Sequence, residues 1–270
     1  MRCVYLDLDG TLLGRNASLV HDGEGAVSLL GARAIEACLR AGVEVLLTSG
    51  RRRAQVAEDA SLLGQTSYIY ESGAALVLDG EELWLTGDLV PGEQTIHDQI
   101  TDSGAPALLL EHYAGRLEYH TPWHVNREVS HLFRGLIDVG EAHGLLAQAG
   151  LGHLRLNDNG VLRHRSPQLA DLPLVRAYHL LPAAASKPGA VARHMQARGL
   201  ERAETFAVGD SREDVTLASV VGTFWLVANG LARDPAIKEV LAGHDNVRVC
   251  EAGYGPGVYE AVITTLAEVR

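Results

Sequence analysis

The sequence predicts an α/β protein in which a Rossmann-like parallel-sheet core, residues 1–80 and 184–270, is interrupted by an α+β domain, residues 81–183. Apolar strand-like runs alternate with helical patterns at both ends of the chain, an order typical of a parallel sheet with helices on both faces. The middle instead holds short alternating strands around two helical stretches, which indicates an insertion. The 270 residues are 47% hydrophobic and 21% charged, an ordinary globular composition with room for both parts.

The core elements follow one another as strand, helix, strand. Each strand is a short apolar run, and each helix is an amphipathic stretch bounded by signals such as the stop at Gly42. In the first half of the core we expect strands at 3–6, 43–47 and 68–70 and helices at 32–40 and 53–63. In the second half we expect strands at 205–208, 223–227 and 247–249 and helices at 234–241 and 258–269.

The insertion is predicted from a different pattern. Its strands are short and alternate polar with apolar residues, and Leu172-Pro173 and Leu181-Pro182 mark its exit. We expect strands at 116–119, 154–156 and 161–164 and helices at 94–101 and 129–147.

Charge and cysteine content exclude several classes of protein. The net charge of −11 argues against a general nucleic-acid surface, and no apolar run approaches the roughly 18 residues of a membrane span. Three widely spaced cysteines form no disulfide framework, and Asp7 and Asp9 come before any signal-like apolar stretch. We therefore expect a cytoplasmic protein that binds neither nucleic acid nor membrane. An anionic substrate would need a local positive pocket within this negative field.

The segment Asp7–Leu12 carries the most chemical information. It follows a buried strand, and ligand sites in open α/β sheets form at the carboxyl ends of strands. One of its two acids could attack a substrate and the other could move a proton, while both together could hold a hard cation. Gly10 and Thr11 place a backbone amide and a hydroxyl beside them. The alternative is an ordinary turn, since Asp and Gly are common turn residues.

Two further motifs combine polar groups that suit an anion. The hydroxyl of Ser49 and the amides around Gly50 suit phosphate oxygens, although a helix N-cap by Ser49 explains that residue better when it is taken alone. Lys187 stands at the start of a predicted helix, where the macrodipole favours anions rather than a cation. An anion bound between this lysine and other groups would explain its position.

A fourth motif again places carboxylates just past a buried strand. Asp210 and Asp214 lie in the segment after the strand at 205–208, and adjacent parallel strands would bring Asp210 to Asp7. Few carboxylates, completed by waters and phosphate oxygens, are what Mg²⁺ prefers. Helix capping by Asp210 or Ser211 would explain one of these residues but not all of them.

These four motifs, in this order, resemble those of the haloacid dehalogenase superfamily in its phosphatase branch. The matched positions are DxDGT at Asp7–Thr11, the small hydroxyl at Ser49 (with Thr48 as an alternative), the lysine at Lys187 and GDSxxD at Gly209–Asp214. The insertion between the second and third motifs is similar to the large cap of subfamily IIB, which includes Cof-type sugar phosphatases. Two residues depart from the family, since Glu213 and Ser72 stand where it often has Asn.

The resemblance implies a role for each motif residue. Asp7 would form an aspartyl-phosphate, and Asp9 would protonate the leaving oxygen and then activate water. Mg²⁺ would neutralise charge on the transferring group. The metal site would consist of the side chains of Asp7 and Asp210, the backbone carbonyl of Asp9 and the nearby side chain of Asp214. The phosphate oxygens would be bound by Thr11, Ser49, Gly50, Lys187 and, as a weaker candidate, Asn229, for which an Asn-Gly turn is at least as good an explanation.

The inserted domain should cover this site and exclude water, as lids do in phosphoryl transfer. A sugar phosphate, or a derivative of phosphoglycerate or phosphoglycolate, would suit its polar and aromatic residues. The candidates for substrate contact are Arg116, His120, Trp123 and Arg127, although each could instead be a strand residue facing solvent. We expect a Mg²⁺-dependent phosphatase of a small phosphorylated metabolite, either monomer or homodimer. The alternatives are a phosphomutase and a non-catalytic phosphometabolite-binding protein.

Overall fold

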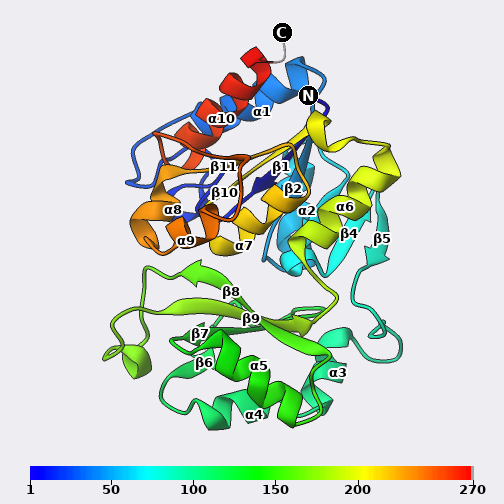
Figure 1. The fold of residues 1–270 in the computed structure, drawn as a ribbon, viewed down its shortest axis with the longest axis vertical. Coiled ribbons are helices and arrows are strands. Elements are labelled where there is room, and N and C mark those ends of the chain that lie inside the picture. The colour runs from blue at the N-terminus through cyan, green and yellow to red at the C-terminus, as the bar shows by residue number, and fades with distance from the viewer. Residues whose placement is uncertain (269–270) are drawn as a thin grey trace.

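The computed structural model describes residues 1–268 and contains two sheets, each with its own helices (Figure 1). The strands of the larger sheet are β1 (Cys3–Asp7), β2 (Glu44–Thr48), β3 (Tyr68–Tyr70), β4 (Ala75–Leu78), β5 (Glu81–Trp84), β10 (Thr205–Gly209), β11 (Thr223–Leu226) and β12 (Val247–Val249). Their spatial order is β12-β11-β10-β1-β2-β3-β4-β5, parallel from β12 to β3 and antiparallel through β4 and β5. This is the predicted α/β core.

Helices cover both faces of the larger sheet because successive strand residues point to opposite sides. The core helices are α1 (Leu30–Arg40), α2 (Arg53–Leu62), α6 (Lys187–Arg198), α7 (Arg212–Val215), α8 (Ala228–Arg233), α9 (Ile237–Leu241) and α10 (Tyr254–Glu268). Val4 and Leu6 of β1 pack with residues of α1, α2 and α10, whereas Tyr5 between them packs with residues of α6 and α9. Both faces of β1 are therefore buried, as expected for a central parallel strand.

Most core elements lie within a few residues of their expected positions, with three differences. The hairpin of β4 and β5 extends the larger sheet, so the inserted domain begins after Trp84 and not at residue 81. The helix α8 was not expected, and the helix expected at 234–241 is confined to α9. The last helix was expected to reach Val269, which lies outside the described residues.

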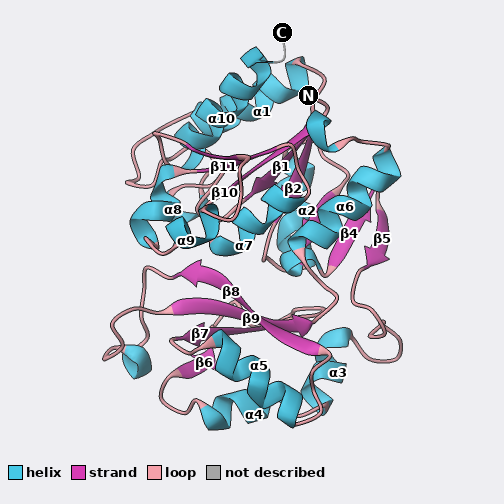
Figure 2. Ribbon diagram, viewed as in Figure 1, coloured by secondary structure: helices cyan, strands magenta, loops and turns pink. Residues whose placement is uncertain are grey.

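The inserted domain is a four-stranded antiparallel sheet with helices on one face. Its elements are α3 (Ile96–Asp102), α4 (Ala105–His112), β6 (Leu117–Tyr119), β7 (His131–Gly135), α5 (Val139–Gln148), β8 (Leu154–Val161) and β9 (Arg176–Pro182). The strand order is β6-β7-β9-β8. Figure 2 shows the helices on the side of this sheet away from the core, while β8 and β9 face the core. The insertion therefore presents a sheet surface, rather than helices, to the larger domain.

Two sequence expectations within the insertion are wrong. The helix expected at 129–147 is the strand β7 followed by α5, because β7 pairs on both sides and buries residues of both its faces, so its apolar positions do not alternate. The strand expected at 154–156 continues to Val161 as β8, with an irregularity between Asp158 and Val161, and residues 162–164 of the second expected strand form no strand. Neither β9 nor α4 was expected. Within residues 1–268 no helix has both the length and the apolar character needed to span a membrane.

Candidate active site

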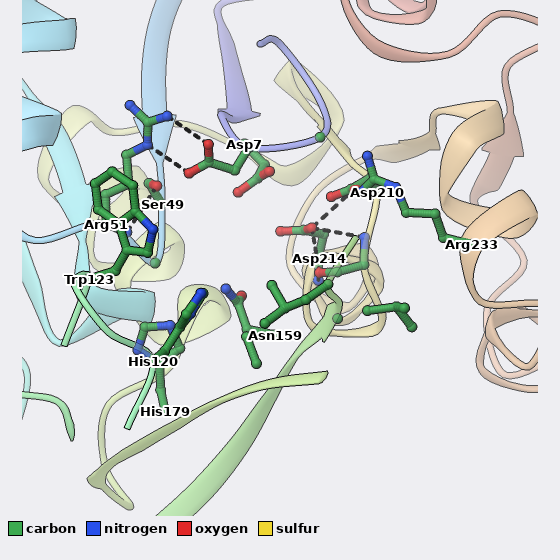
Figure 3. Close-up of a pocket in the computed structure, with 18 of the residues that line it drawn as sticks. Asp7, Ser49, Arg51, His120, Trp123, Asn159, His179, Asp210, Asp214 and Arg233 are labelled. Atoms are coloured by element: carbon green, nitrogen blue, oxygen red, sulfur yellow. Dashed lines mark hydrogen bonds and ion pairs between the residues drawn. The ribbon is translucent and has the colours of Figure 1, made fainter. Parts of the chain in front are cut away.

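Three aspartates from two neighbouring strands meet at one edge of the larger sheet (Figure 3). Asp7 is the last residue of β1, and Asp210 and Asp214 follow β10, which pairs with β1 in parallel. Each offers a carboxylate oxygen that lies within 4.8 Å of the oxygens offered by the other two. The hydroxyl of Thr11 lies between two of them, 3.1 Å from Asp7 Oδ2 and 3.4 Å from Asp210 Oδ1.

Lys187 is the cation that balances this cluster. Its side chain is 1% exposed, and its Nζ donates to Asp7 Oδ1 at 2.9 Å and to Asp214 Oδ1 at 2.6 Å. The Ser186 hydroxyl accepts a hydrogen bond from Gly189 N and so begins α6, which leaves the lysine free to point into the cluster. The carboxylates raise the pKa of Lys187 well above its ordinary value despite the opposing effect of burial, so the ammonium stays charged.

Asp7 and Asp210 of the cluster, and the neighbouring Glu213, hold protons more tightly than free carboxylic acids do. Burial, followed by repulsion from Asp214, raises the pKa of Asp7 well above its ordinary value. Burial raises the pKa of Asp210 to about 7, although Arg233 lies 2.9 Å away and favours the charged form. Burial likewise raises the pKa of Glu213 to about 7. The carboxylates of Asp7, Asp210, Glu213 and Asp214 lie here with the cations of Lys187 and Arg233, so a further cation would favour their charged forms.

Asp214 divides its two oxygens between two tasks. Oδ2 accepts from the backbone N and the hydroxyl of Ser211, at 3.1 and 2.6 Å, in a capping box that begins α7. Oδ1 accepts from Lys187. Helix capping therefore does explain Ser211, as the sequence allowed, but it leaves Asp214 in contact with the lysine.

Asp9 is held apart from the other acids by Arg51. The guanidinium donates to both carboxylate oxygens of Asp9, at 2.7 and 2.6 Å, and also to Asp59 at 2.7 Å. The Asp9 side chain is 58% exposed, so it lies on the solvent side of the cluster. Its carboxylate is not one of the three that converge there.

The Ser49–Gly50 loop follows β2, next to β1. Ser49 is buried and its hydroxyl accepts from Arg51 N at 3.1 Å. The alternative that Ser49 caps a helix is wrong, because α2 begins after Arg52, where no side-chain cap is formed. A Cβ atom on Gly50 would lie 3.0 Å from His179 Nε2, so the missing side chain allows the inserted domain to approach this loop closely.

A cavity of about 510 Å³ lies between the core and the inserted domain. The sequence-predicted residues that line it are Asp7, Asp9, Ser49, Gly50, His120, Trp123, Arg127, Asp210 and Asp214. Arg127 reaches across from the inserted domain, and its two terminal nitrogens donate to the Gly50 carbonyl at 3.1 and 2.7 Å. Trp123 also lines the cavity and is 52% exposed.

Four predicted site residues do not line the cavity. Arg116 is exposed and its guanidinium lies over the ring of Tyr113, 5.2 Å from the centroid. Asn229 has both ends of its amide occupied by backbone, since Nδ2 donates to Gly10 O and Oδ1 accepts from Tyr254 N, each at 2.8 Å. The alternative of an Asn-Gly turn is also wrong, because Asn229 lies in α8. Thr11 and Lys187 lie beneath the cavity rather than in its wall.

Sequence reasoning did not single out three residues of the cavity wall. Arg51 directly follows the Ser49–Gly50 motif, and that adjacency was a usable signal. Arg233 reaches Asp210 from α8, one helical turn after Asn229, but this helix was not expected. His179 comes from β9, a strand that the sequence did not reveal.

The two departures from the superfamily pattern touch one another. The hydroxyl of Ser72 donates to Glu213 Oε2 at 3.4 Å, and both side chains are buried. Glu213 Oε2 also lies 3.9 Å from Lys187 Nζ. A longer acid at one position is therefore matched by a shorter polar side chain at the other.

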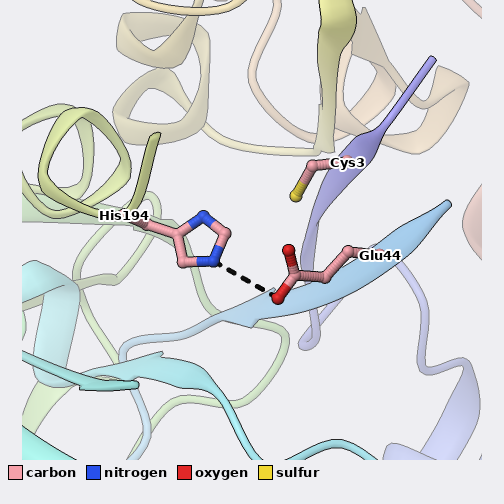
Figure 4. Close-up of side chains that lie close together, drawn as sticks. All are labelled: Cys3, Glu44 and His194. Carbon is pink, nitrogen blue, oxygen red and sulfur yellow. Dashed lines mark ion pairs between the residues drawn. The ribbon is translucent and has the colours of Figure 1, made fainter. Parts of the chain in front are cut away.

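A second group of possible ligands lies at the opposite ends of β1 and β2 (Figure 4). Cys3 pairs with Glu44 in the sheet, and His194 of α6 lies 3.4 Å from the Glu44 carboxylate. Arg198 also pairs with Glu44, at 3.2 Å, and the Tyr5 hydroxyl lies 2.9 Å from His194 Nδ1. Burial strongly raises the pKa of the Cys3 thiol. These internal pairs account for the cluster as a link between α6 and the sheet.

Comparisons with known proteins agree with this architecture, although no family model matches the sequence. The chain is 25% identical to a phosphoglycolate phosphatase of Methanoculleus marisnigri, over 97% of this chain and 95% of that protein. It is 26% identical to a phosphoglycolate phosphatase of Archaeoglobus fulgidus, over 88% and 87% of the two chains.

Solved structures show the same fold. The sucrose-phosphatase of Synechocystis sp. superposes with a TM-score of 0.67 at 15% identity, over 98% of both chains. A subclass IIB sugar phosphatase of the haloacid dehalogenase superfamily superposes with a TM-score of 0.61 at 15% identity, over 99% of this chain and 98% of the other. In its fold, its motifs and these relatives, the chain is similar to phosphatases of the haloacid dehalogenase superfamily that carry the large cap of subclass IIB.

Proposed function

We propose that this enzyme is a Mg²⁺-dependent phosphatase of a small phosphorylated metabolite, either a sugar phosphate or a derivative of phosphoglycerate or phosphoglycolate. The observation that carries the proposal is the position of Asp7. Its carboxylate lies at the base of the cavity, within hydrogen-bond distance of Lys187 and close to Asp210 and Asp214. A carboxylate so placed can attack phosphorus while charged groups around it stabilise the transferring phosphoryl group.

The proposed reaction has two steps that use the chain's own residues. In the first, an Asp7 oxygen bonds to phosphorus, the ester P–O bond breaks, and the leaving oxygen takes a proton from Asp9. In the second, Asp9 accepts a proton from water, whose oxygen attacks phosphorus and frees Asp7 and inorganic phosphate. Arg51 would act as the positioning residue that holds the Asp9 carboxylate at the cavity wall, since it donates to both of its oxygens.

The carboxylate cluster fits a magnesium ion. Asp7, Asp210 and Asp214 supply only oxygen ligands, which hard cations prefer. Burial raises the pKa of Asp7 and of Asp210, and a bound cation would favour their charged forms. When bound, Mg²⁺ would supply positive charge that stabilises the oxygens of the transferring group. Asp9 would contribute at most its backbone carbonyl, because its side chain is engaged by Arg51.

The cavity supports a leaving group with several polar atoms. A volume of about 510 Å³ is within the range of pockets that enclose small molecules, and its wall includes His120, Trp123 and Arg127 from the cap. An indole face beside polar side chains suits a sugar ring, which has both apolar faces and hydroxyl groups.

Release of inorganic phosphate tests the proposal. We expect the purified protein to release phosphate from members of a panel of phosphorylated metabolites, to lose this activity in EDTA, and to regain it when excess Mg²⁺ is added. The EDTA-treated enzyme with added Na⁺ is the control for ionic strength. Isomer exchange without phosphate release would instead identify a phosphomutase, and binding of these metabolites without turnover would identify a non-catalytic binding protein.

Magnesium should stabilise the fold more at pH 8 than at pH 5.5. Folding raises the pKa of Asp210 and of Glu213 to about 7, so the folded protein binds extra protons, and the metal-free fold loses stability as pH rises from about 4 to about 7. Bound Mg²⁺ would offset this loss, whereas at pH 5.5 it must displace protons. Buried histidines with lowered pKa values make the fold more stable as pH rises. They do so equally with and without Mg²⁺, so their effect cancels when the two melting temperatures at one pH are subtracted. Thermal melts in Mg²⁺ and in EDTA at both pH values measure how much Mg²⁺ raises the melting temperature. An equal rise at pH 5.5 and pH 8 would contradict the expectation.

The two cap arginines should behave differently when each is changed to alanine. We expect Arg127→Ala to lower kcat/KM by about 10-fold or more, because it removes both bonds to the Gly50 carbonyl and a cation from the cavity wall. Arg116→Ala is the matched control, because this guanidinium lies over Tyr113 outside the cavity. We expect it to leave kcat/KM within about twofold of wild type, as is usual for surface changes. Equal effects of the two variants in steady-state assays would contradict this assignment.

A further inference from the structure

His179 has a ring nitrogen that faces the cavity without a partner. The residue lies on β9 of the cap, and its ring lines the cavity beside Asn159 (Figure 3). Nδ1 lies 3.1 Å from the Ser130 hydroxyl, whereas within residues 1–268 the structure gives Nε2 no hydrogen bond. Nε2 stands directly over the Ser49–Gly50 loop, since a Cβ on Gly50 would lie 3.0 Å from it. A ligand atom above that loop would meet this nitrogen.

A chain of hydrogen bonds determines which ring nitrogen carries the proton. Glu71, a buried residue between β3 and β4 of the core, accepts from Glu128 N, Ser130 N and the Ser130 hydroxyl, at 2.8, 2.6 and 2.7 Å. The Ser130 hydroxyl has a single proton and donates it to Glu71 Oε2. The Ser130 oxygen must then accept from Nδ1–H of His179. Nε2 therefore carries a lone pair and acts as an acceptor.

The surroundings keep the ring neutral. Burial, followed by the positive charges of Arg127 and Lys187, lowers the pKa of His179 well below its ordinary value. The same positive charges would repel an ammonium group brought to Nε2. A neutral hydroxyl group is then the donor that this position accommodates best.

We propose that His179 selects substrates whose leaving group carries a hydroxyl group, which donates a hydrogen bond to Nε2, and that Ser130 and Glu71 are positioning residues that hold this tautomer. The proposal rests on the proposed phosphatase function and names the chemistry of its leaving group. It assigns the selection to the cap, whereas the aspartates of the core act on phosphorus.

The role of His179 is tested by comparing the wild-type enzyme with one variant on pairs of substrates that differ only in hydroxyl groups. Wild type and His179→Phe would be assayed with glycerol 1-phosphate against propyl phosphate, and with glucose 6-phosphate against its deoxy derivatives. We expect wild type to prefer a hydroxylated member by about 10-fold to 100-fold in kcat/KM, mainly through KM, and the variant to lose this preference. For p-nitrophenyl phosphate, whose leaving group has no aliphatic hydroxyl, we expect the substitution to lower kcat/KM by a smaller factor than for the hydroxylated esters.

The outcomes separate this proposal from the broader one. A preference that persists in His179→Phe would overturn the role of His179, whereas a wild-type enzyme that hydrolyses none of these esters would overturn the phosphatase function itself. His143→Gln is the control, because this histidine lies on α5 and bonds the Leu156 backbone, outside the cavity. It should leave every ratio unchanged.

Nitrogen NMR tests the tautomer without relying on activity. In protein labelled with ¹⁵N-histidine, we expect His179 to be protonated at Nδ1 and not at Nε2, with its signals assigned by their loss in His179→Gln. Ser130→Ala removes the acceptor for Nδ1–H, so the second tautomer should appear and KM for the hydroxylated ester should rise while kcat for p-nitrophenyl phosphate is retained. A wild-type ring protonated at Nε2 would overturn the proposal.

Discussion

Asp7→Asn should abolish phosphate release and, at the same time, raise the thermal midpoint of the metal-free protein. An amide cannot form the acyl phosphate under these conditions, so we expect kcat to fall by about 10⁴-fold or more. Stability should rise because burial and Asp214 disfavour the charged carboxylate, as the raised pKa of Asp7 shows. The neutral amide has nearly the same shape and removes that repulsion. Phosphate-release assays and thermal melts in EDTA measure the two effects.

The opposite signs of these two effects make the test specific. A variant that merely misfolds would lose activity and stability together. Asp102→Asn is the matched control, since this exposed carboxylate of α3 accepts a hydrogen bond from Gln94 and lies outside the cavity. It should change neither quantity. Turnover of Asp7→Asn close to that of wild type would remove Asp7 from the mechanism.

Lys187→Met should cost about 3–5 kcal/mol of the free energy of unfolding, because it leaves the buried carboxylates of Asp7 and Asp214 without their shared cation. Methionine nearly matches the length and volume of the lysine stem, so packing is largely kept. Activity should also be lost, because the ammonium is a buried positive group 2.9 Å from the Asp7 oxygen that we propose attacks phosphorus. Urea unfolding at pH 8, where the acids are ionised, measures the loss of stability.

A double variant separates the two roles of the lysine. Adding Asp214→Asn to Lys187→Met removes one of the uncompensated charges, so the stability should recover in part while the activity stays absent. Simple addition of the two single effects on stability would mean that Lys187 and Asp214 do not interact, contrary to their 2.6 Å contact.

The carboxylate cluster was predictable because it depends on local sequence and simple topology. Asp7 and Asp210 each follow a short apolar strand, and parallel strands bring their carboxyl ends to a single edge. The packing of Lys187 against them could be expected from its unusual place at a helix start, although its near-complete burial could not. The sequence thus indicated the order of the strands along the chain and the residues at their carboxyl ends, which are the two things that place the carboxylates.

Contacts that depend on unexpected elements could not be predicted. Asn229 and Arg233 lie one turn apart on α8, so the same short helix brings one to the Gly10 carbonyl and the other to Asp210. Without that helix, Asn229 looked like a free polar group for phosphate. His179 was missed for a similar reason, because β9 lies in the cap sheet and has no distinct sequence pattern.

The contact between Ser72 and Glu213 has a consequence for the ancestry of this chain. The two residues lie on opposite sides of the cap in the sequence, yet they share a hydrogen bond beside the buried lysine. Asparagine introduced at either place alone would meet a partner of the wrong length, so each replacement would be tolerated only in the background of the other. Across homologous lineages these two positions should therefore have evolved as a unit, with their residue types exchanged together.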